Sequence, residues 1–238
     1  MARVKPYFEL KYLIDNSQAF ALKALLQPLC QPDRNGKDGS YEVLSLYYDT
    51  PNLQFHRDKI EGVFSRKKVR LRLYRNDLNK QWQDPTFEIK CKKGVFTSKQ
   101  RKQLADLTLS NLHASNSLAQ ELSEHPQILI PSALIFYKRQ AFFCKGIEGL
   151  RLTFDSCFSA IPTSRFQFAQ DFNFYQSALL QKLPQIFEIK SYTGVPESLL
   201  QLPEKVKAYQ TSFSKYATAI NLQKQRLFSL FARNDQAF

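Results

Sequence analysis

Residues 66–74, RKKVRLRLY, alternate basic and apolar side chains. Successive side chains of a β-strand point to opposite faces. One face of this stretch therefore carries Arg66, Lys68, Arg70 and Arg72, and the other carries Lys67, Val69, Leu71 and Leu73. Four like charges in a row repel one another unless water or anions lie between them. The stretch predicts a strand with one largely apolar face and one face suited to anions.

The same division into a charged and an apolar face recurs along the chain. It is present in residues 7–14, 86–92, 135–143, 150–155 and 185–192, and the tetrad FEIK occurs twice, at 87–90 and 187–190. Several such strands predict a barrel or a sandwich. The alternation alone leaves two arrangements open. The charged faces either point outward to solvent or point inward and form a basic tunnel.

Helical segments are available to cover such a sheet from outside. Apolar residues at helical spacing predict helices over 17–29, with Ser17 as N-cap, and over 101–124. Short helices are expected around Pro203 within 196–210, and a last helix over 214–231. Residues 32–40, PDRNGKDGS, are rich in turn formers and predict a loop.

The charge distribution points to an anionic ligand. The 238 residues carry a net charge of +13, and residues 57–102 hold 15 Lys and Arg against 5 Asp and Glu. Clustering of this kind creates a local field that attracts polyanions. The seven glycines form neither a GxxxxGK[ST] nor a GxGxxG motif, and no HExxH or GxSxG motif occurs. Any phosphate would therefore be held by side chains and not by a glycine-rich loop.

Targeting signals and cysteine usage indicate a cytoplasmic protein. There is no run of about 18 apolar residues that would predict a membrane span, and the basic N-terminus lacks the apolar segment of a signal peptide. Cys30, Cys91, Cys144 and Cys157 are widely spaced and form no CxxC motif. This spacing predicts reduced thiols and disfavours a zinc ribbon or a disulfide scaffold.

Eight short motifs in order carry a resemblance to a known family. They are FELKY (8–12), YYDTP (47–51), RLRLY (70–74), FEIK (87–90), YKRQAF (137–142), RLTFD (151–155), FEIK (187–190) and SKY (214–216). The set resembles the catalytic domain of the vacuolar transporter chaperone (VTC) polyphosphate polymerases, within the CYTH or triphosphate tunnel metalloenzyme superfamily. The resemblance implies one α+β domain over 1–238, built as a closed antiparallel β-barrel of about eight strands. Its interior would be basic, with the helices packed outside.

The resemblance also implies roles for individual residues. The implied activity is metal-dependent transfer of the γ-phosphoryl group of ATP to a polyphosphate chain. The catalytic set is Arg70, Arg72, Lys90, Arg139 and Arg151; the substrate-binding set is Lys11, Lys68, Lys99, Tyr137, Lys190, Ser214 and Lys215; Glu188 and Glu9 would bind Mn²⁺ or Mg²⁺. Two positions depart from the pattern: Tyr7 replaces the first Glu of the superfamily's ExExK, and Ser212 lies near a position where the polymerases often have lysine.

Other functions remain open at this point. A related hydrolase would release phosphate from a triphosphate, and a non-catalytic module would bind polyphosphate or inositol phosphates. Nucleic-acid binding is disfavoured because no RRM, HTH or KH signature occurs. The expected partners are ATP and polyphosphate, and a membrane partner is possible because the eukaryotic relatives act in a membrane complex. Tyr47 and Tyr48 are expected to pack in the core, Asp49 to form a turn, and Asp155 to bind metal or pair with an Arg.

Overall fold

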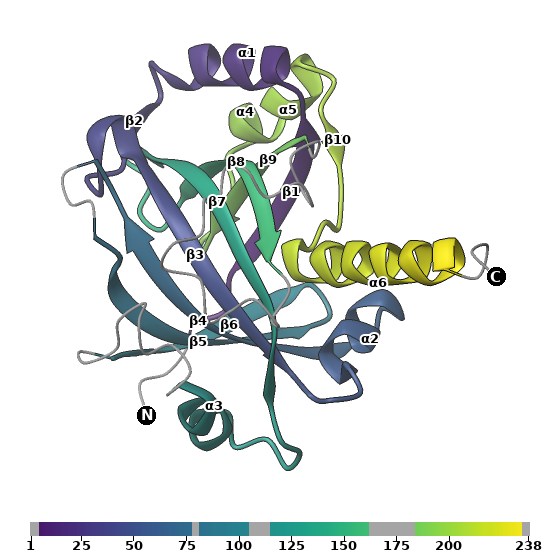
Figure 1. The fold of residues 1–238 in the computed structure, drawn as a ribbon. Coiled ribbons are helices and arrows are strands. Elements are labelled where there is room, and N and C mark those ends of the chain that lie inside the picture. Colours follow the sequence, from purple (N-terminus) through teal and green to yellow (C-terminus); the bar gives the residue numbers. More distant parts are fainter. Residues whose placement is uncertain (1–4, 78–80, 105–114, 162–183, 235–238) are drawn as a thin grey trace.

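A computed structural model describes residues 5–77, 81–104, 115–161 and 184–234. Within these ranges the chain forms one antiparallel sheet of ten strands (Figure 1). The strands are β1 (Phe8–Ile14), β2 (Cys30–Pro32), β3 (Ser40–Asp49), β4 (Ser65–Arg75), β5 (Gln83–Lys93), β6 (Phe96–Gln103), β7 (Ile130–Cys144), β8 (Arg151–Ile161), β9 (Gln185–Ser191) and β10 (Tyr209–Gln210). Their order is β10-β1-β9-β8-β7-β3-β4-β5-β6, and β2 pairs with β7. The strands predicted from alternation are all present.

The described α-helices are α1 (Asn16–Leu26), α2 (Gln54–Ile60), α3 (Ser115–Ser123), α4 (Glu197–Leu200), α5 (Leu202–Lys205) and α6 (Lys215–Asn234). Five of them lie outside the sheet, and α6 packs against inner-face side chains of β3, β7 and β8. The N-cap of helix α1 is Asp15 and not Ser17, two residues earlier than predicted. The Asp15 carboxylate accepts a hydrogen bond from Gln18 N at 2.8 Å, and the Gln18 side chain accepts one from Asp15 N at 2.9 Å. The predicted loop at 32–40 contains a short 3₁₀ turn, Lys37–Gly39.

The helix predicted over 101–124 is partly wrong. Residues 101–103 end strand β6, which pairs with β5 from Phe96 to Gln103. Helical structure begins at Ser115, and residues 105–114 lie outside the described part of the chain. Strand pairing prevails over helical spacing here because β5 satisfies the backbone groups of residues 96–103, and the alternation of the strand turns Lys99 and Arg101 to the central cavity.

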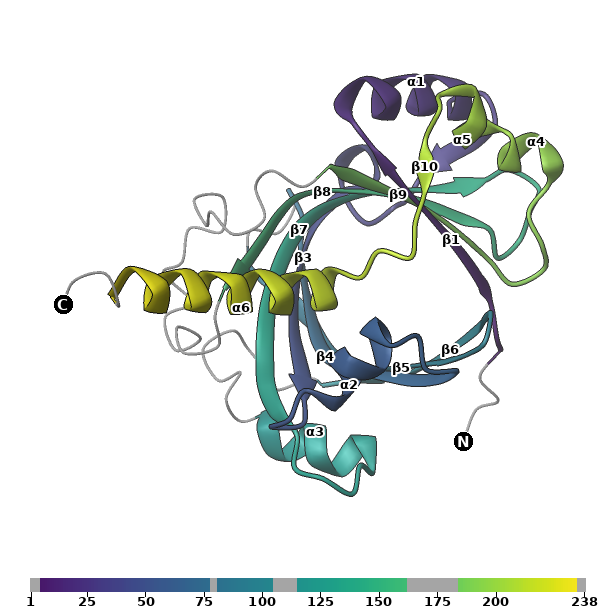
Figure 2. The same cartoon turned by 90° about the vertical axis from the view of Figure 1, so that its right-hand side faces the viewer.

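The sheet curls strongly but does not close as a continuous barrel. Figure 2 shows it curling around a central axis, with β1 and β6 as the two sides of a seam. These strands share one isolated bridge, in which Tyr7 and Thr97 exchange backbone hydrogen bonds of 2.9 and 3.2 Å. The predicted closed barrel is therefore corrected to an open one. The remaining backbone of edge strand β6 has no partner strand on the seam side among the described residues.

The apolar faces of the strands point away from the barrel axis and form two outer cores. One core joins Val69, Leu71 and Phe87 of β4 and β5 to Phe55 of α2 and Ala119 of α3. The other joins inward-turned residues of α1, α4 and α5 to the outer faces of β1, β8 and β9. Figures 1 and 2 both show α1, α4 and α5 together on one side of the sheet. The charged faces are consequently turned to the interior, which the alternation alone left open.

Helix α6 packs on a third core that belongs to the inner wall. Tyr216, Ala219 and Ile220 contact a cluster from β3, β7 and β8 that includes Ile135 and Phe158. As predicted, Asp49 serves a turn: its carboxylate accepts hydrogen bonds from the backbone of Thr50, Phe55 and His56. It also accepts one from the Tyr216 hydroxyl at 2.6 Å. Asp49 therefore holds Tyr216, in the first turn of α6, against α2. This contact sets the position of Ser214 and Lys215, the two residues directly before Tyr216.

Candidate functional site

All fourteen residues predicted for the site line one central cavity of about 90 Å³. They come from seven strands and from the start of α6, so elements distant in sequence meet at one place. The members are Glu9, Lys11, Lys68, Arg70, Arg72, Lys90, Lys99, Tyr137, Arg139, Arg151, Glu188, Lys190, Ser214 and Lys215. Sequence reasoning thus found the residues that converge, while the role of each one stays a prediction.

The arginines of β4 are held in place by a buried carboxylate on β5. Arg70 lies opposite Glu88 in the β4–β5 ladder, and its Nε donates to Glu88 Oε2 at 2.7 Å. Arg72 Nη1 lies 3.4 Å from the same oxygen. Lys99 and Arg101 of β6 contact the other carboxylate oxygen. Glu88 is fully buried. Burial alone would raise its pKa, but these four cations hold the pKa well below its usual range.

A second buried carboxylate organises the opposite wall. Asp155 of β8 accepts two hydrogen bonds from Arg139, from Nε at 2.6 Å and from Nη2 at 2.7 Å. Lys215 Nζ lies 2.5 Å from the same carboxylate. Burial would raise the pKa of Asp155, but Arg139 and Lys215 outweigh this and lower it. Of the two predicted alternatives for Asp155, metal binding or pairing with an Arg, the structure shows the pairing.

Arg151 is positioned by Asp33 and Tyr41. Its Nη2 donates to Asp33 Oδ2 at 2.8 Å and to the Tyr41 hydroxyl at 2.6 Å. Asp33 belongs to the loop after β2, so this loop fixes one of the predicted phosphate contacts. Buried carboxylates therefore hold all four of the predicted catalytic arginines, and such fixed donors need little reorganisation when a substrate binds.

Two further carboxylates, Glu9 and Glu188, line the cavity itself. Lys11 Nζ lies between them, 3.4 Å from Glu9 and 2.6 Å from Glu188. Glu9 also pairs with Lys90 Nζ at 2.6 Å. Burial would raise the pKa of Glu9, but Lys11 and Lys90 lower it to about 2. The pKa of Glu188 is held well below its usual range because Lys11, Lys215 and Arg139 outweigh its burial.

Glu9 and Glu188 fit a divalent cation that is shared with a substrate. Mg²⁺ prefers oxygen ligands and usually binds one or two carboxylates together with phosphate oxygens and water. The Lys11 ammonium shows that a cation is accommodated between these two carboxylates. In the described ranges, no three His, Cys, Asp or Glu side chains are grouped so that they could hold a metal by themselves. Glu9 and Glu188 could therefore bind Mg²⁺ or Mn²⁺ only if phosphate oxygens supplied further ligands.

The site carries a large excess of positive charge. Eleven Lys and Arg side chains line the cavity, and the described carboxylates that line it or pair with those cations are five: Asp33, Glu9, Glu88, Asp155 and Glu188. The surplus of six positive charges lies inside a protein wall, where screening by salt is weaker than on the surface. A compact anion of high charge is the ligand that such an enclosure favours.

Five residues that line the cavity lie outside the predicted set: Tyr7, Tyr41, Tyr47, Tyr74 and Arg101. Tyr47 was expected to pack in the core. It is buried and stacks on Tyr216, but its hydroxyl accepts a hydrogen bond from Arg70 Nη1 at 2.9 Å. The alternation of faces along a strand could have identified residues of this kind in the sequence. Tyr7, for example, shares a face with Glu9 and Lys11. Arg101 follows Lys99 by two positions, which places both on the inner face once β6 is recognised as a strand.

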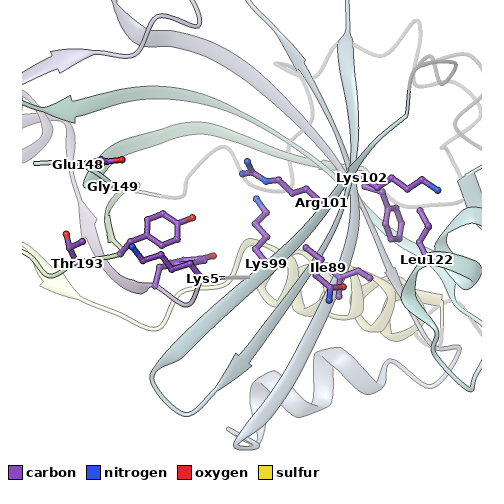
Figure 3. A pocket seen from close by; sticks show the side chains of 13 residues that line it. Lys5, Ile89, Lys99, Arg101, Lys102, Leu122, Glu148, Gly149 and Thr193 are labelled. Atoms are coloured by element: carbon purple, nitrogen blue, oxygen red, sulfur yellow. The ribbon is translucent and has the colours of Figure 1, made fainter. Parts of the chain in front are cut away.

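Three larger cavities adjoin the central one. The largest, of about 950 Å³, follows the seam and shares Tyr7, Lys99 and Arg101 with the central cavity (Figure 3). In Figure 3, Lys99 and Arg101 extend from the same side of β6. A second, of about 580 Å³, shares Tyr41 and Arg139. The third, of about 450 Å³, lies beside α2 and the segment before α6. The central cavity therefore shares lining residues with surface cavities on more than one side.

The fold and the site define an open, strongly curled antiparallel sheet that gathers cationic side chains from many strands around one central cavity. The chain belongs to the family described as the VTC domain, whose model matches residues 6–224. This confirms the resemblance drawn from the eight motifs. A comparison with curated proteins gives no match.

Solved structures support the fold. A protein named PH1819 from Pyrococcus horikoshii superposes with a TM-score of 0.53 at 12% identity, covering 92% of this chain and 98% of its own. A proposed adenylate cyclase from Vibrio parahaemolyticus gives a TM-score of 0.52 at 12% identity, covering 89% of this chain and 96% of its own. At this identity the likeness concerns the fold alone. In the part of the chain that the structure describes, no helix combines the length and apolar character needed to cross a bilayer.

Proposed function

We propose that this protein is a metal-dependent polyphosphate polymerase, which transfers the γ-phosphoryl group of ATP to a growing polyphosphate chain. Membership of the VTC domain family and the tunnel fold support an activity on triphosphates or polyphosphates. The observation that carries the proposal is the enclosed surplus of six positive charges. A linear condensed phosphate is a thin anion with charge along its whole length, so it matches a narrow basic passage.

The arginines would hold the reacting phosphoryl group. Phosphoryl transfer passes through a loose transition state with charge spread over the peripheral oxygens, and guanidinium groups bind such oxygens in pairs. Arg70, Arg72 and Arg139 are already oriented by Glu88 and Asp155. Each of these carboxylates lies on the neighbouring strand of the ladder. Phosphoryl oxygens would take the place of some of those carboxylate contacts.

Glu9 and Glu188 would hold Mg²⁺ or Mn²⁺ together with the phosphate oxygens. When bound, this ion would neutralise charge on the triphosphate and act as a Lewis acid. Lys11 would then move from its position between the two carboxylates to a phosphate oxygen. The acceptor is a phosphate that is already anionic, so the chain needs no dedicated general base.

The proposal is tested with purified protein, ATP and either Mn²⁺ or Mg²⁺, with product length read on a gel. We expect a ladder of polyphosphate from the wild type. Arg72→Ala should lower the rate by about 10²–10³-fold, the effect of removing one preorganised donor. Lys67→Ala, which changes an exposed outward lysine of the same strand, should leave the rate unchanged.

The products also separate the alternatives. Free phosphate without polymer would identify a hydrolase. Tight polyphosphate binding without any metal-dependent turnover would identify a binding module. Either result would overturn the polymerase.

A further inference from the structure

Two cysteines lie side by side on the sheet, away from the central cavity. Cys30 of β2 is directly opposite Cys144 of β7 in their antiparallel ladder, so the two side chains share one face. Both belong to the outer core that packs against α1, and they are 5% and 8% exposed. Neither lines the central cavity. The phosphate site therefore makes no use of these two thiols.

The backbone pairing beside the two cysteines sets their separation. The next opposed pair is hydrogen-bonded, because Lys145 N donates to Leu29 O at 3.1 Å. Hydrogen-bonded and non-hydrogen-bonded pairs alternate along an antiparallel ladder, so Cys30 and Cys144 form a non-hydrogen-bonded pair, whose α carbons are typically about 4.5 Å apart. Disulfides span α-carbon distances of about 4.4–6.8 Å. A disulfide can therefore form here with little movement of the backbone.

The two thiols are free and differ in acidity. A hydrogen bond from the Cys144 thiol and the charge of Lys145 lower the pKa of Cys30, although its burial opposes them. The same hydrogen bond and burial raise the pKa of Cys144. The thiolate is the nucleophilic form of a cysteine. Cys30 is therefore the thiol that reacts first with an oxidant, and Cys144 is in contact with it to complete a disulfide.

The other two cysteines have no such partner in the described strands. Cys91 of β5 lies opposite Lys67 of β4 and Ser98 of β6. Cys157 of β8 is exposed, and no cysteine is opposite it in the ladders with β7 and β9. These two residues therefore serve as internal controls for any chemistry that depends on a matched pair of thiols.

We propose that Cys30 and Cys144 form a reversible redox site, in which hydrogen peroxide converts the two thiols to a cross-strand disulfide. The Cys30 thiolate attacks one peroxide oxygen; the O–O bond breaks, a sulfenic acid forms on Cys30, and the other oxygen leaves as water with the thiol proton. The Cys144 sulfur then attacks the Cys30 sulfur. The S–S bond forms as the S–O bond breaks, and the hydroxyl leaves as a second water with the Cys144 proton. The two electrons lost by the thiols reduce the peroxide, and a dithiol reductant reverses the reaction by exchange.

The disulfide would secure the strand that leads to an anchor of the phosphate site. Strand β2 is three residues long and pairs with β7 alone among the described strands. Asp33 directly follows β2, and its carboxylate accepts a hydrogen bond from Arg151 Nη2 at 2.8 Å. A cross-link at Cys30 restrains β2 on β7 and opposes the local opening that would release Asp33 from Arg151. Oxidation would therefore preserve the contact that positions Arg151.

Peptide mapping tests the chemistry. The full chain is treated with hydrogen peroxide in the absence of reductant, unfolded in N-ethylmaleimide to block the remaining thiols, and digested for mass spectrometry. We expect a linked pair of peptides that contain Cys30 and Cys144, which dithiothreitol separates. The control variant Cys91→Ala, Cys157→Ala should form the link to the same extent. A Cys30 that is blocked by maleimide, is oxidised onward to sulfinic acid, or is linked to Cys91 or Cys157 would overturn the proposal.

Thermal unfolding and hydrogen exchange test the effect on the fold, with the Cys91→Ala, Cys157→Ala variant in its oxidised and reduced forms. We expect oxidation to raise the Tm by about 5–10 °C, because the cross-link restricts the unfolded chain between residues 30 and 144. Exchange of the β2 amides should slow by about tenfold. Adding Cys30→Ala to this variant should abolish both changes. If that protein does not fold, the reduced form is the reference. An equal Tm and equal exchange in the two redox states would overturn the proposal.

Discussion

The two FEIK tetrads have the same four residues and the same inward orientation, yet their glutamates have different surroundings. Glu88 is fully buried among Arg70, Arg72, Lys99 and Arg101. Glu188 lines the cavity and contacts Lys11 and Arg139. The tetrad therefore determines which face of its strand carries the glutamate, while side chains of the neighbouring strands determine what that glutamate contacts. We interpret Glu88 as a positioning residue and Glu188 as a residue available to substrate and metal.

Glu88→Gln should produce the largest effect, and on stability. The substitution leaves Arg70, Arg72 and Lys99 buried without their counter-charge, and breaking a buried pair in this way costs about 3–5 kcal/mol. Urea unfolding measures the change, with exposed Glu61→Gln as control. Added tripolyphosphate should restore part of the loss, since a bound anion stabilises the folded state. A loss under about 1 kcal/mol would refute the positioning role.

Glu188→Gln should lower the activity strongly and the stability only slightly. We expect a rate at least about 100-fold lower, because even partners one step removed from a metal change activity by 10–100-fold. The loss of unfolding free energy should be smaller than for Glu88→Gln, since Glu188 borders the cavity and its neighbours can reach water. Steady-state rates at several Mn²⁺ concentrations provide the measurement. If excess metal has no effect on either protein, the metal role of Glu188 is wrong.

Glu9 connects the two tetrads, since it pairs with Lys90 of the first and shares Lys11 with Glu188 of the second. Its pKa is lowered to about 2 in the folded state. A depressed folded-state pKa stabilises the protein above the unfolded-state value of about 4.5, and the contribution is lost as pH falls from about 5 to 2. We expect about 2–3 kcal/mol from Glu9 in this window.

Glu9→Gln should flatten the wild-type pH profile of the unfolding free energy in that window, and Glu61→Gln should not. An unchanged slope in Glu9→Gln would show that Glu9 keeps an ordinary pKa in the folded protein.

The smallest expected effects on stability come from the lysines of the two tetrads, Lys90 and Lys190. Lys190 Nζ lies 4.0 Å from the centre of the Tyr7 ring and donates to the Tyr192 hydroxyl at 2.9 Å, with no salt bridge among the described residues. Lys190→Ala should lower the unfolding free energy by about 0.5–1 kcal/mol, the value of an exposed cation–π contact. Lys90→Ala should cost more, because it leaves Glu9 with Lys11 alone. Thermal unfolding of the two variants checks the order, and equal losses would contradict it.

The sequence predicted the strands and the shared faces well because alternation with period two is a local property. It could not decide which face points inward, since both orientations give the same pattern; the family resemblance supplied that. Glu88 was missed as a site residue because its importance comes from β4 and β6, which lie beside it only after folding. Arg101 was missed because residues 101–124 show helical spacing, and the partner that makes 96–103 a strand is β5. Barrel closure could not be foreseen from motifs, because it depends on how far β1 and β6 approach.

The outward-facing cores have a consequence for the energetics of heating. Unfolding exposes apolar surface, which raises the heat capacity, and polar surface, which lowers it. Here the central cavity is lined mostly by ionic groups and tyrosines, so the polar share of the newly hydrated area is larger than for a cavity filled with hydrocarbon. The heat-capacity increment of unfolding should therefore fall below the common range of about 12–15 cal/mol/K per residue. Scanning calorimetry would then give a flatter stability curve, and the protein would change little in stability between cold and warm surroundings.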